Sequence, residues 1–408
     1  MAIAGIIAEF DPFHNGHKHL IDTVRRALAP RAVVCVMSGQ FTQRGEPAVL
    51  DKFTRAELAV RCGADLVAEL PVSCAVNAAR EFAFGGVSTL GLLGVCTHLA
   101  FGSETADLAL LEGAAQAALE EGGAFREELR RQLESGKPYG TAYALALKAS
   151  AAPLTADLSG FPGSNDILAL EYIKQLKTGD FGMSALAVRR EGAGHRQAEA
   201  GAQGSGFASG QAIRELLRQK DPDAAAPYVP GCTLNALRSA RDLSQMQAEM
   251  FAILRYTLTQ KSPEEIACAP GVSEGLENVI LREIRGASDY EDLIARVRSR
   301  RYPRGRVCRV LAQLLLGIER QHLEDLQSQP AYVRVLAFNE TGAGLISEAR
   351  KMQKARIIVN PGREEWDPSG MPSNLKLDMR ASEVYGMLSG RSPYDSSDFV
   401  NIPKLFRI

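Results

Sequence analysis

The sequence predicts an α/β fold: a Rossmann-like parallel-sheet domain, then a mostly helical region, then a small C-terminal α/β unit. Short apolar runs alternate with helical patterns in the first half of the chain, helical patterns dominate from about 220 to 325, and a strand–helix–strand pattern closes the chain. Because parallel strands need long crossover connections, usually helices, this alternation indicates a parallel sheet. We therefore expect three segments, with limits 1–219, 220–330 and 331–408.

The predicted strands are the buried apolar runs, with limits 2–10, 32–37, 65–70, 97–102 and 183–190. Apolar residues at helical spacing predict helices directly after the first strand and at 51–63, 107–150, 166–176 and 207–219, and Ser209 is a suitable N-cap for the last. Residues 152–166 are expected to form a loop, and the glycine-rich stretch 191–206 is expected to be mobile. Near the C-terminus we predict a strand at 332–338, a helix at 341–354 and a strand at 355–359.

Composition places the chain among ordinary globular proteins, with 408 residues, 46% apolar and 23% charged, and a net charge of −1. The charge is unevenly spread, because the segment from Arg296 to Arg309 holds many arginines and no acid. Such a patch favours binding of a polyanion. The scattered cysteines include no CxxC pair, and the sequence contains neither a signal-peptide pattern nor a long apolar span. We expect a cytoplasmic protein with free thiols.

The motif "HNGH" follows the first predicted strand, at the start of the first helix. In open α/β sheets ligands bind beyond the carboxyl ends of the strands, and a helix N-terminus suits phosphate. Gly16 allows close approach of a nucleotide, and His14 and His17 can donate hydrogen bonds to a reacting phosphate. Two alternatives remain open: a zinc site built on the two histidines, although no HExxH or paired cysteine accompanies them, and a purely structural role.

Other residues at predicted strand and helix ends suit a nucleotide site on chemical grounds. Gly102 ends a strand, Asn165 begins a helix and Arg190 ends another strand, where it can pair with phosphate. Each also has a bland interpretation, as a strand end, a helix cap or surface charge. Likewise Arg44, Lys52 and Arg55 either bind phosphates or form a solvated helix face.

"HNGH" resembles the HxGH signature of the nucleotidyltransferase superfamily, and its context "AEFDPFHNGH" resembles the form found in small-molecule adenylyltransferases. "FASGQAIR" at 207–214 resembles the superfamily's serine-rich second motif, with Gln211 in place of the usual threonine. The resemblance implies that Ser209 and Arg214 meet the β- and γ-phosphates of ATP. A KMSKS-like segment is absent from the sequence, which argues against an aminoacyl-tRNA synthetase.

A closer resemblance covers nearly the whole chain, through the segments 38–71, 101–104, 164–176, 188–195, 300–309, 335–342 and 378–385. They are similar to the bacterial tRNA(Met) cytidine acetate ligase family. The family resemblance implies an enzyme that uses ATP, with Mg²⁺ as its possible companion, to convert acetate to acetyl-adenylate and then acetylates N4 of the wobble cytidine of elongator tRNA(Met). It also implies these ATP contacts: Ile7, Ala8, Glu9, Phe10, Asp11, Pro12, Phe13, His14, Asn15, Gly16, His17, Lys18, His19, Leu20, Gly102, Asn165 and Arg190.

The arginine patch is predicted to bind the tRNA, and Tyr302 to stack on an unpaired base. The residues assigned to it are Arg298, Arg300, Arg301, Tyr302, Arg304, Arg306 and Arg309. Two other functions are considered: a small-molecule adenylyltransferase acting on a phosphorylated cofactor precursor, and a non-catalytic RNA-binding protein. A small substrate needs neither the C-terminal extension nor the patch, and the nucleotidyltransferase residues argue against loss of catalysis. The sequence reveals neither the oligomeric state nor the base that deprotonates the cytosine amine.

Overall fold

The fold is described from a computed structural model, which covers residues 1–120, 122–137, 139–150, 161–191, 206–328, 331–366, 370–403 and 405–407. Most of the predicted loop at 152–166 and nearly all of the glycine-rich stretch at 191–206 lie outside the described residues. The predictions made for those two segments are therefore not tested.

The described residues form an eight-stranded sheet in the order β5-β4-β1-β2-β3-β6-β7, with β8 beside β6. The strands are β1 (Ile3–Ala8), β2 (Ala32–Ser38), β3 (Leu66–Leu70), β4 (His98–Ser103), β5 (Ser184–Arg189), β6 (Tyr332–Asn339), β7 (Arg356–Ile358) and β8 (Leu405–Phe406). The first five strands pair in parallel, as predicted, and β1 lies between β2 and β4. The chain therefore reverses its direction across the sheet between β1 and β4, and such switch points bind ligands.

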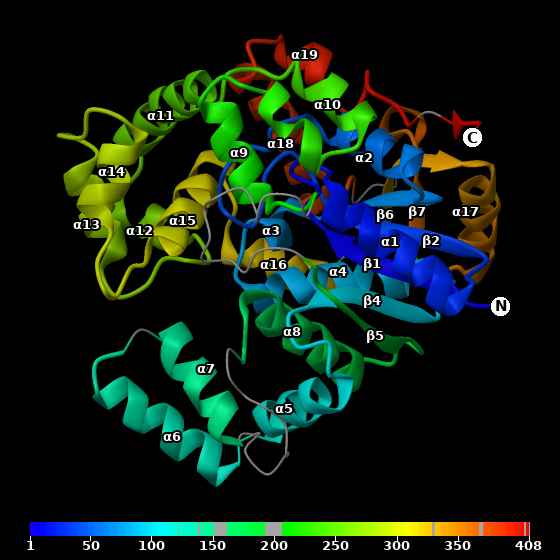
Figure 1. The fold of residues 1–408 in the computed structure, drawn as a ribbon. Coiled ribbons are helices and arrows are strands. Elements are labelled where there is room, and N and C mark those ends of the chain that lie inside the picture. The colour runs from blue at the N-terminus through cyan, green and yellow to red at the C-terminus, as the bar shows by residue number, and fades with distance from the viewer. Residues whose placement is uncertain are drawn as a thin grey trace.

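Helices cover both faces of the sheet (Figure 1). One face packs against α1 (Asn15–Leu28) and α2 (Lys52–Arg61), which bury Ile21 and Val24 beside Ile6 and Cys35. The other face packs against α4 (Ala79–Leu93), α5 (Leu108–Glu120), α8 (Ser164–Thr178) and α17 (Glu340–Met352). These two apolar layers hold β1 and β4 rigidly, and the polar residues that follow their ends are fixed with them.

The segment from 220 to 328 is helical, as predicted, and packs beside the sheet (Figure 1). It contains η1 (Asp223–Tyr228), α10 (Gly231–Leu237), α11 (Leu243–Thr259), α12 (Pro263–Ala267), α13 (Leu276–Glu283), α14 (Tyr290–Val297), α15 (Arg304–Leu316) and α16 (Arg320–Ser328). The remaining elements are α3 (Val72–Ala75), α6 (Gly123–Glu134), α7 (Tyr139–Ser150), α9 (Gly210–Arg218), η2 (Pro361–Arg363), α18 (Ser373–Leu388) and α19 (Pro393–Ser396).

The C-terminal strands extend the main sheet. β6 and β7 are parallel to each other, as the strand–helix–strand pattern suggests, but β6 runs antiparallel to β3, with Leu66 opposite Phe338. The predicted parallel sheet is thus confirmed for β1 to β5. The sequence analysis predicted no pairing between the C-terminal unit and this sheet, and the predicted segment limits stay predictions. No helix of the described residues is long and apolar enough to cross a membrane.

Candidate active site

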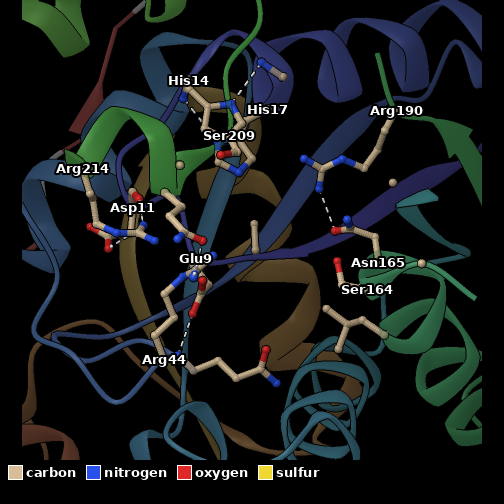
Figure 2. Close-up of a pocket in the computed structure, with 18 of the residues that line it drawn as sticks. Glu9, Asp11, His14, His17, Arg44, Ser164, Asn165, Arg190, Ser209 and Arg214 are labelled. Carbon is tan, nitrogen blue, oxygen red and sulfur yellow. Dashed lines mark hydrogen bonds and ion pairs between the residues drawn. The ribbon is translucent and has the colours of Figure 1, made fainter. Parts of the chain in front are cut away.

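A cavity of about 1540 Å³ opens beyond the carboxyl ends of β1 and β4, at the switch point of the sheet. Its wall is built by the ends of β1, β4 and β5, by the first turns of α1, α8 and α9, and by the first turns of α15. The segments that the sequence analysis singled out, near residues 14, 102, 165, 190 and 209, therefore meet in one place (Figure 2).

His14 and His17 form a stacked pair at the N-terminus of α1, with ring centroids 3.7 Å apart. His14 is the N-cap, and its Nδ1 accepts a hydrogen bond from the Gly16 amide at 3.1 Å. The Nδ1 atom of His17 accepts from the His14 amide at 3.2 Å. Because an accepting Nδ1 carries no proton, each neutral imidazole carries its proton on Nε2. The pair therefore supplies two oriented N–H donors to the cavity that both rings line.

The surroundings keep both rings neutral. Burial, reinforced by the positive charges of Arg190 and Arg214, lowers the pKa of His14 to about 3. Burial, with His14 and Arg190 nearby, also lowers the pKa of His17 well below its ordinary value. Neutral imidazoles suit a phosphate that gains negative charge during the reaction, since each donates a hydrogen bond to it without transferring a proton. The structure thus fits the phosphate role predicted for the "HNGH" motif, which remains a prediction.

A second helix N-terminus faces the same cavity. Ser209 caps α9, as predicted, and its Oγ accepts from the Ala212 amide at 3.2 Å. The start of α9 lies tightly against the loop after β1, since a Cβ added to Gly210 would be 3.0 Å from the Asp11 carbonyl oxygen. Arg214 Nη1 donates to that carbonyl at 2.6 Å and lies 3.3 Å from Asp11 Oδ2. Arg214 therefore joins the two helix starts, and this part of its guanidinium is already occupied.

A chain of contacts joins three residues of the cavity wall, Arg190, Asn165 and Glu104, and Figure 2 shows the first contact, between Arg190 and Asn165. Arg190 Nη1 donates to Asn165 Oδ1 at 2.6 Å, and Asn165 Nδ2 donates to Glu104 Oε1 at 2.6 Å. Glu104 Oε2 also accepts from the Asp166 amide at 2.9 Å, so the carboxylate caps α8. Gly102 lies beside this chain, because a Cβ there would be 3.2 Å from Arg190 Cγ. Sequence reasoning missed Glu104, although it follows the end of β4 directly.

The predicted ATP contacts divide into two sets, according to whether they line the cavity. One set lines the cavity: Ile7, Ala8, Glu9, Asp11, His14, Gly16, His17, His19, Leu20, Gly102, Asn165, Arg190, Ser209 and Arg214. The other set does not line it: Phe10, Pro12, Phe13, Asn15 and Lys18. Phe10 and Phe13 pack in the core, Asn15 donates to the Gly206 and Pro227 carbonyls, and Lys18 pairs with Asp22 at the surface.

Lys52 and Arg55 differ from both interpretations weighed for them, because they are neither phosphate ligands in the cavity nor solvated. Lys52 Nζ lies 2.8 Å from Glu69 Oε1 and 2.9 Å from Asp398 Oδ1, and all three side chains are buried. Arg55 donates to the carbonyl oxygens of Leu50, Glu9, Ser38 and Gly39. These cations hold the loops after β1 and β2 in place. Arg44, in contrast, does line the cavity.

The members of the arginine patch also differ in whether the protein itself satisfies their side chains. Arg304 pairs with both Glu291 oxygens at 2.6 and 2.8 Å, and Arg306 donates to the Gly271 carbonyl and to Ser273 Oγ. Tyr302 is 7% exposed and its hydroxyl donates to the Glu274 carbonyl at 2.8 Å. The predicted stacking of Tyr302 on a base is therefore wrong for this structure, because the ring is buried.

The remaining patch arginines have different surroundings. Arg309 lines the cavity, Arg301 lies 3.5 Å from Glu274, and Arg298 and Arg300 are exposed. Within the described residues, no group of three or more His, Cys, Asp and Glu side chains could hold a metal ion. Both Nδ1 atoms of the histidine pair are moreover engaged by backbone amides.

Comparison with known proteins shows which family this chain belongs to. Residues 1–398 match the family model described as HIGH Nucleotidyl Transferase. The chain is 34% identical over 406 residues to the tRNA(Met) cytidine acetate ligase of Thermoanaerobacter sp. strain X514, covering 98% of this chain and 99% of that protein. It is 32% identical over 418 residues to the enzyme of the same name from Clostridium perfringens, covering 100% of both chains.

Solved structures give the same result. The apo crystal structure of Thermotoga maritima TmcAL superposes with a TM-score of 0.87 at 30% identity, covering 99% of this chain and 100% of that chain. The crystal structure of the same protein bound with alpha-thio ATP superposes with a TM-score of 0.85 at 30% identity, covering 100% of both chains.

Proposed function

Because this chain belongs to the tRNA(Met) cytidine acetate ligase family, within the HIGH nucleotidyltransferases, we propose that it is an ATP-dependent ligase acting on elongator tRNA(Met) in the cytoplasm. It activates acetate as acetyl-adenylate, releasing diphosphate. It then transfers the acetyl group to N4 of the wobble cytidine, giving N4-acetylcytidine and AMP. The observation that carries the proposal is the stacked His14–His17 pair, whose two Nε2–H groups serve a cavity at the switch point of the sheet.

Formation of the adenylate needs a donor set for the α-phosphate, which becomes crowded and more negative when the acetate oxygen attacks. His14 and His17 supply neutral donors there, and the N-termini of α1 and α9 supply backbone amides and a partial positive charge. On the other side, the Asn165–Arg190 contact offers polar groups to the nucleotide, and Gly102 leaves room for it. Mg²⁺ enters with the triphosphate of ATP in this proposal, held by the phosphates more than by the chain.

The transfer step requires that the tRNA and the adenylate meet. Arg304 and Arg309 of α15 line the same cavity as His14, so an anticodon loop bound to the arginine patch is adjacent to the proposed adenylate. Accordingly, we assign ATP binding to residues 1–219 and tRNA binding to 220–330, with 331–408 completing the sheet. A small cofactor precursor needs no such patch, and this disfavours the alternative of a small-molecule adenylyltransferase.

Incubation with ATP, labelled acetate and total bacterial tRNA tests the proposal. We expect label in one elongator tRNA(Met), at N4 of its wobble cytidine after digestion to nucleosides. The control omits ATP, and it should give no label. Absence of label from all tRNA, together with adenylylation of a phosphorylated cofactor precursor, would refute the proposal in favour of that alternative.

A further inference from the structure

Two residues of opposite charge in the cavity take no part in the phosphate chemistry described above. Glu9 follows β1, and its Oε1 accepts from the Gln43 amide at 2.6 Å. Arg44 follows β2, and its Nη1 lies 3.4 Å from Gln211 Oε1. The buried Nε of Arg44 has no hydrogen-bond partner among the described residues. A buried polar atom normally has a partner, so the unpaired Nε indicates that Arg44 awaits a ligand.

In the type of its donors and acceptors, the pair is complementary to one edge of an amino-pyrimidine. Cytosine presents the N4 amine as a donor next to N3 and O2, which are acceptors. A carboxylate accepts from N4, and a guanidinium donates to N3 and O2. Uracil presents an O4 acceptor and an N3–H donor instead, so its O4 would meet the Glu9 carboxylate without a hydrogen bond. The same two side chains therefore also discriminate cytosine from uracil.

We propose that Glu9 and Arg44 form the acceptor subsite for the target cytosine, and that Glu9 takes the proton that N4 loses during acetyl transfer. The inference rests on the proposed function and adds the base and the nucleobase subsite to it. It also gives Glu9 a role different from the ATP contact that the family resemblance implies.

The step balances in atoms and charge. The N4 lone pair attacks the carbonyl carbon of acetyl-adenylate, a C–N bond forms, and the bond from this carbon to the phosphate oxygen breaks. AMP leaves with that electron pair, N4 gives one proton to Glu9 Oε2, and Glu9 then releases it to solvent. Since the lone pair of N4 is delocalised into the ring, removal of the proton as the bond forms makes the amine an adequate nucleophile.

The surroundings of Glu9 suit this task. The Gln43 amide holds Oε1 and so orients the carboxylate. Among the described residues no hydrogen bond is made to Oε2, which is left for a ligand. Burial raises the pKa of Glu9, and the guanidinium groups of Arg44 and Arg214 partly oppose that rise. A carboxylate with a raised pKa is a stronger base than an exposed one. Figure 2 shows Glu9 and Arg44 in the same cavity as His14 and His17, where the adenylate would form.

The subsite is also connected to the arginine patch. Gly45 has a φ of +77°, and a Cβ there would overlap the Cys308 backbone, so the loop that carries Arg44 lies directly on α15. Arg304, Cys308 and Arg309 of α15 line the cavity beside it. The cavity volume of about 1540 Å³ exceeds the roughly 300–1,000 Å³ of ordinary small-ligand pockets, leaving space for a nucleotide and a base together.

Glu9→Gln tests the proposal, because its amide oxygen still accepts from Gln43 while the base is lost. Two assays are compared: acetate-dependent ATP–pyrophosphate exchange, and single-turnover transfer to tRNA from preformed acetyl-AMP. We expect exchange within about twofold of the unsubstituted enzyme and transfer slower by about 100-fold or more. Transfer by the unsubstituted enzyme should also decline on acidification through the raised pKa of Glu9, and the variant should lack that decline. Glu215→Gln, at another carboxylate of the cavity, should change neither assay.

A second variant tests the recognition of the base. Arg44→Met should raise the tRNA concentration needed for half-maximal transfer and leave the KM for ATP in exchange unchanged. Transfer by Glu9→Gln at the unsubstituted rate would overturn the proposal. A raised KM for ATP in either variant would also overturn it, because the pair would then bind the adenine of ATP. If the unsubstituted protein shows no exchange at all, the proposed function itself fails.

Discussion

Two groups of polar side chains near the ends of β1 and β2 differ in how their charges are satisfied. Lys52 and Arg55 are fully buried, and carboxylates or carbonyl oxygens of the chain surround their charged groups. His14 and His17 use one ring nitrogen each for backbone amides and leave the other for the cavity. Residue type does not separate the two groups, since both contain basic side chains at the starts of neighbouring helices, α1 and α2. What separates them is whether donors remain for a ligand.

Lys52 and Arg55, whose charged groups are satisfied by the chain itself, should control stability. The substitution Lys52→Met should have the largest effect that we predict. Burial lowers the pKa of Lys52, but Asp398 and Glu69 outweigh it and the net shift is upward, so the side chain is charged. Its removal leaves the buried Glu69 carboxylate without its ion-pair partner and leaves Asp398 with Arg334 alone among the described cations, 3.3 Å away. We expect the free energy of unfolding in urea to fall by about 3–5 kcal/mol, while the rate of ATP–pyrophosphate exchange per folded molecule stays unchanged.

Lys18→Met is the matched control for this variant. Lys18 pairs with Asp22 on α1, but the two side chains are 48% and 45% exposed. An exposed pair of this kind contributes only about 0.3–0.5 kcal/mol. Equal losses of stability in the two lysine variants would contradict the claim that the buried contacts of Lys52 control stability.

The histidine pair, which keeps donors for a ligand, should control catalysis. His14→Ala and His17→Ala each remove one donor to the reacting phosphate, and we expect acetate-dependent ATP–pyrophosphate exchange to fall by about 100-fold or more. His14→Ala also removes the N-cap of α1, at about 1 kcal/mol, so unfolding is measured in parallel. His98→Ala, on β4 outside the cavity, is the control and should exchange normally. Normal ATP–pyrophosphate exchange in both the His14→Ala and the His17→Ala variant would refute the phosphate role of the two histidines.

This difference also explains how far the sequence could predict the molecule. β1 to β5 were predictable because each is built on a short, mainly apolar run, and Ser209 because an N-cap is a local signal. The role of Lys52 was not, since Asp398 lies 346 positions away in the sequence. The antiparallel pairing of β6 with β3 has no local signal either. Candidate site residues could be identified from "HNGH", but Glu104 could not, because only the fold brings it to Asn165.

We expect the smallest effect from substitutions in the arginine patch. There too, the question is whether a side chain has donors left for a ligand. Arg298 and Arg300 are exposed and have no carboxylate within ion-pair distance among the described residues, whereas Arg304 is held by Glu291. Each arginine that neutralises a tRNA phosphate adds about 0.7–0.9 to the slope of log K against log salt concentration. Arg298→Ala combined with Arg300→Ala should therefore weaken tRNA binding and reduce that slope by about 1.5, measured by filter binding at several salt concentrations.

Arg304→Ala is the comparison within the patch. Because the guanidinium of Arg304 must leave Glu291 before it can contact a phosphate, its removal should change the salt slope by less than half as much as the double substitution. Both variants, the double substitution and Arg304→Ala, should keep acetate-dependent ATP–pyrophosphate exchange, since that step needs no tRNA. Arg304→Ala could instead reduce the slope as much as the double substitution does. In that case ion pairing in the free protein does not determine which arginines bind the tRNA, and the availability of donors would not predict ligand contacts at the surface.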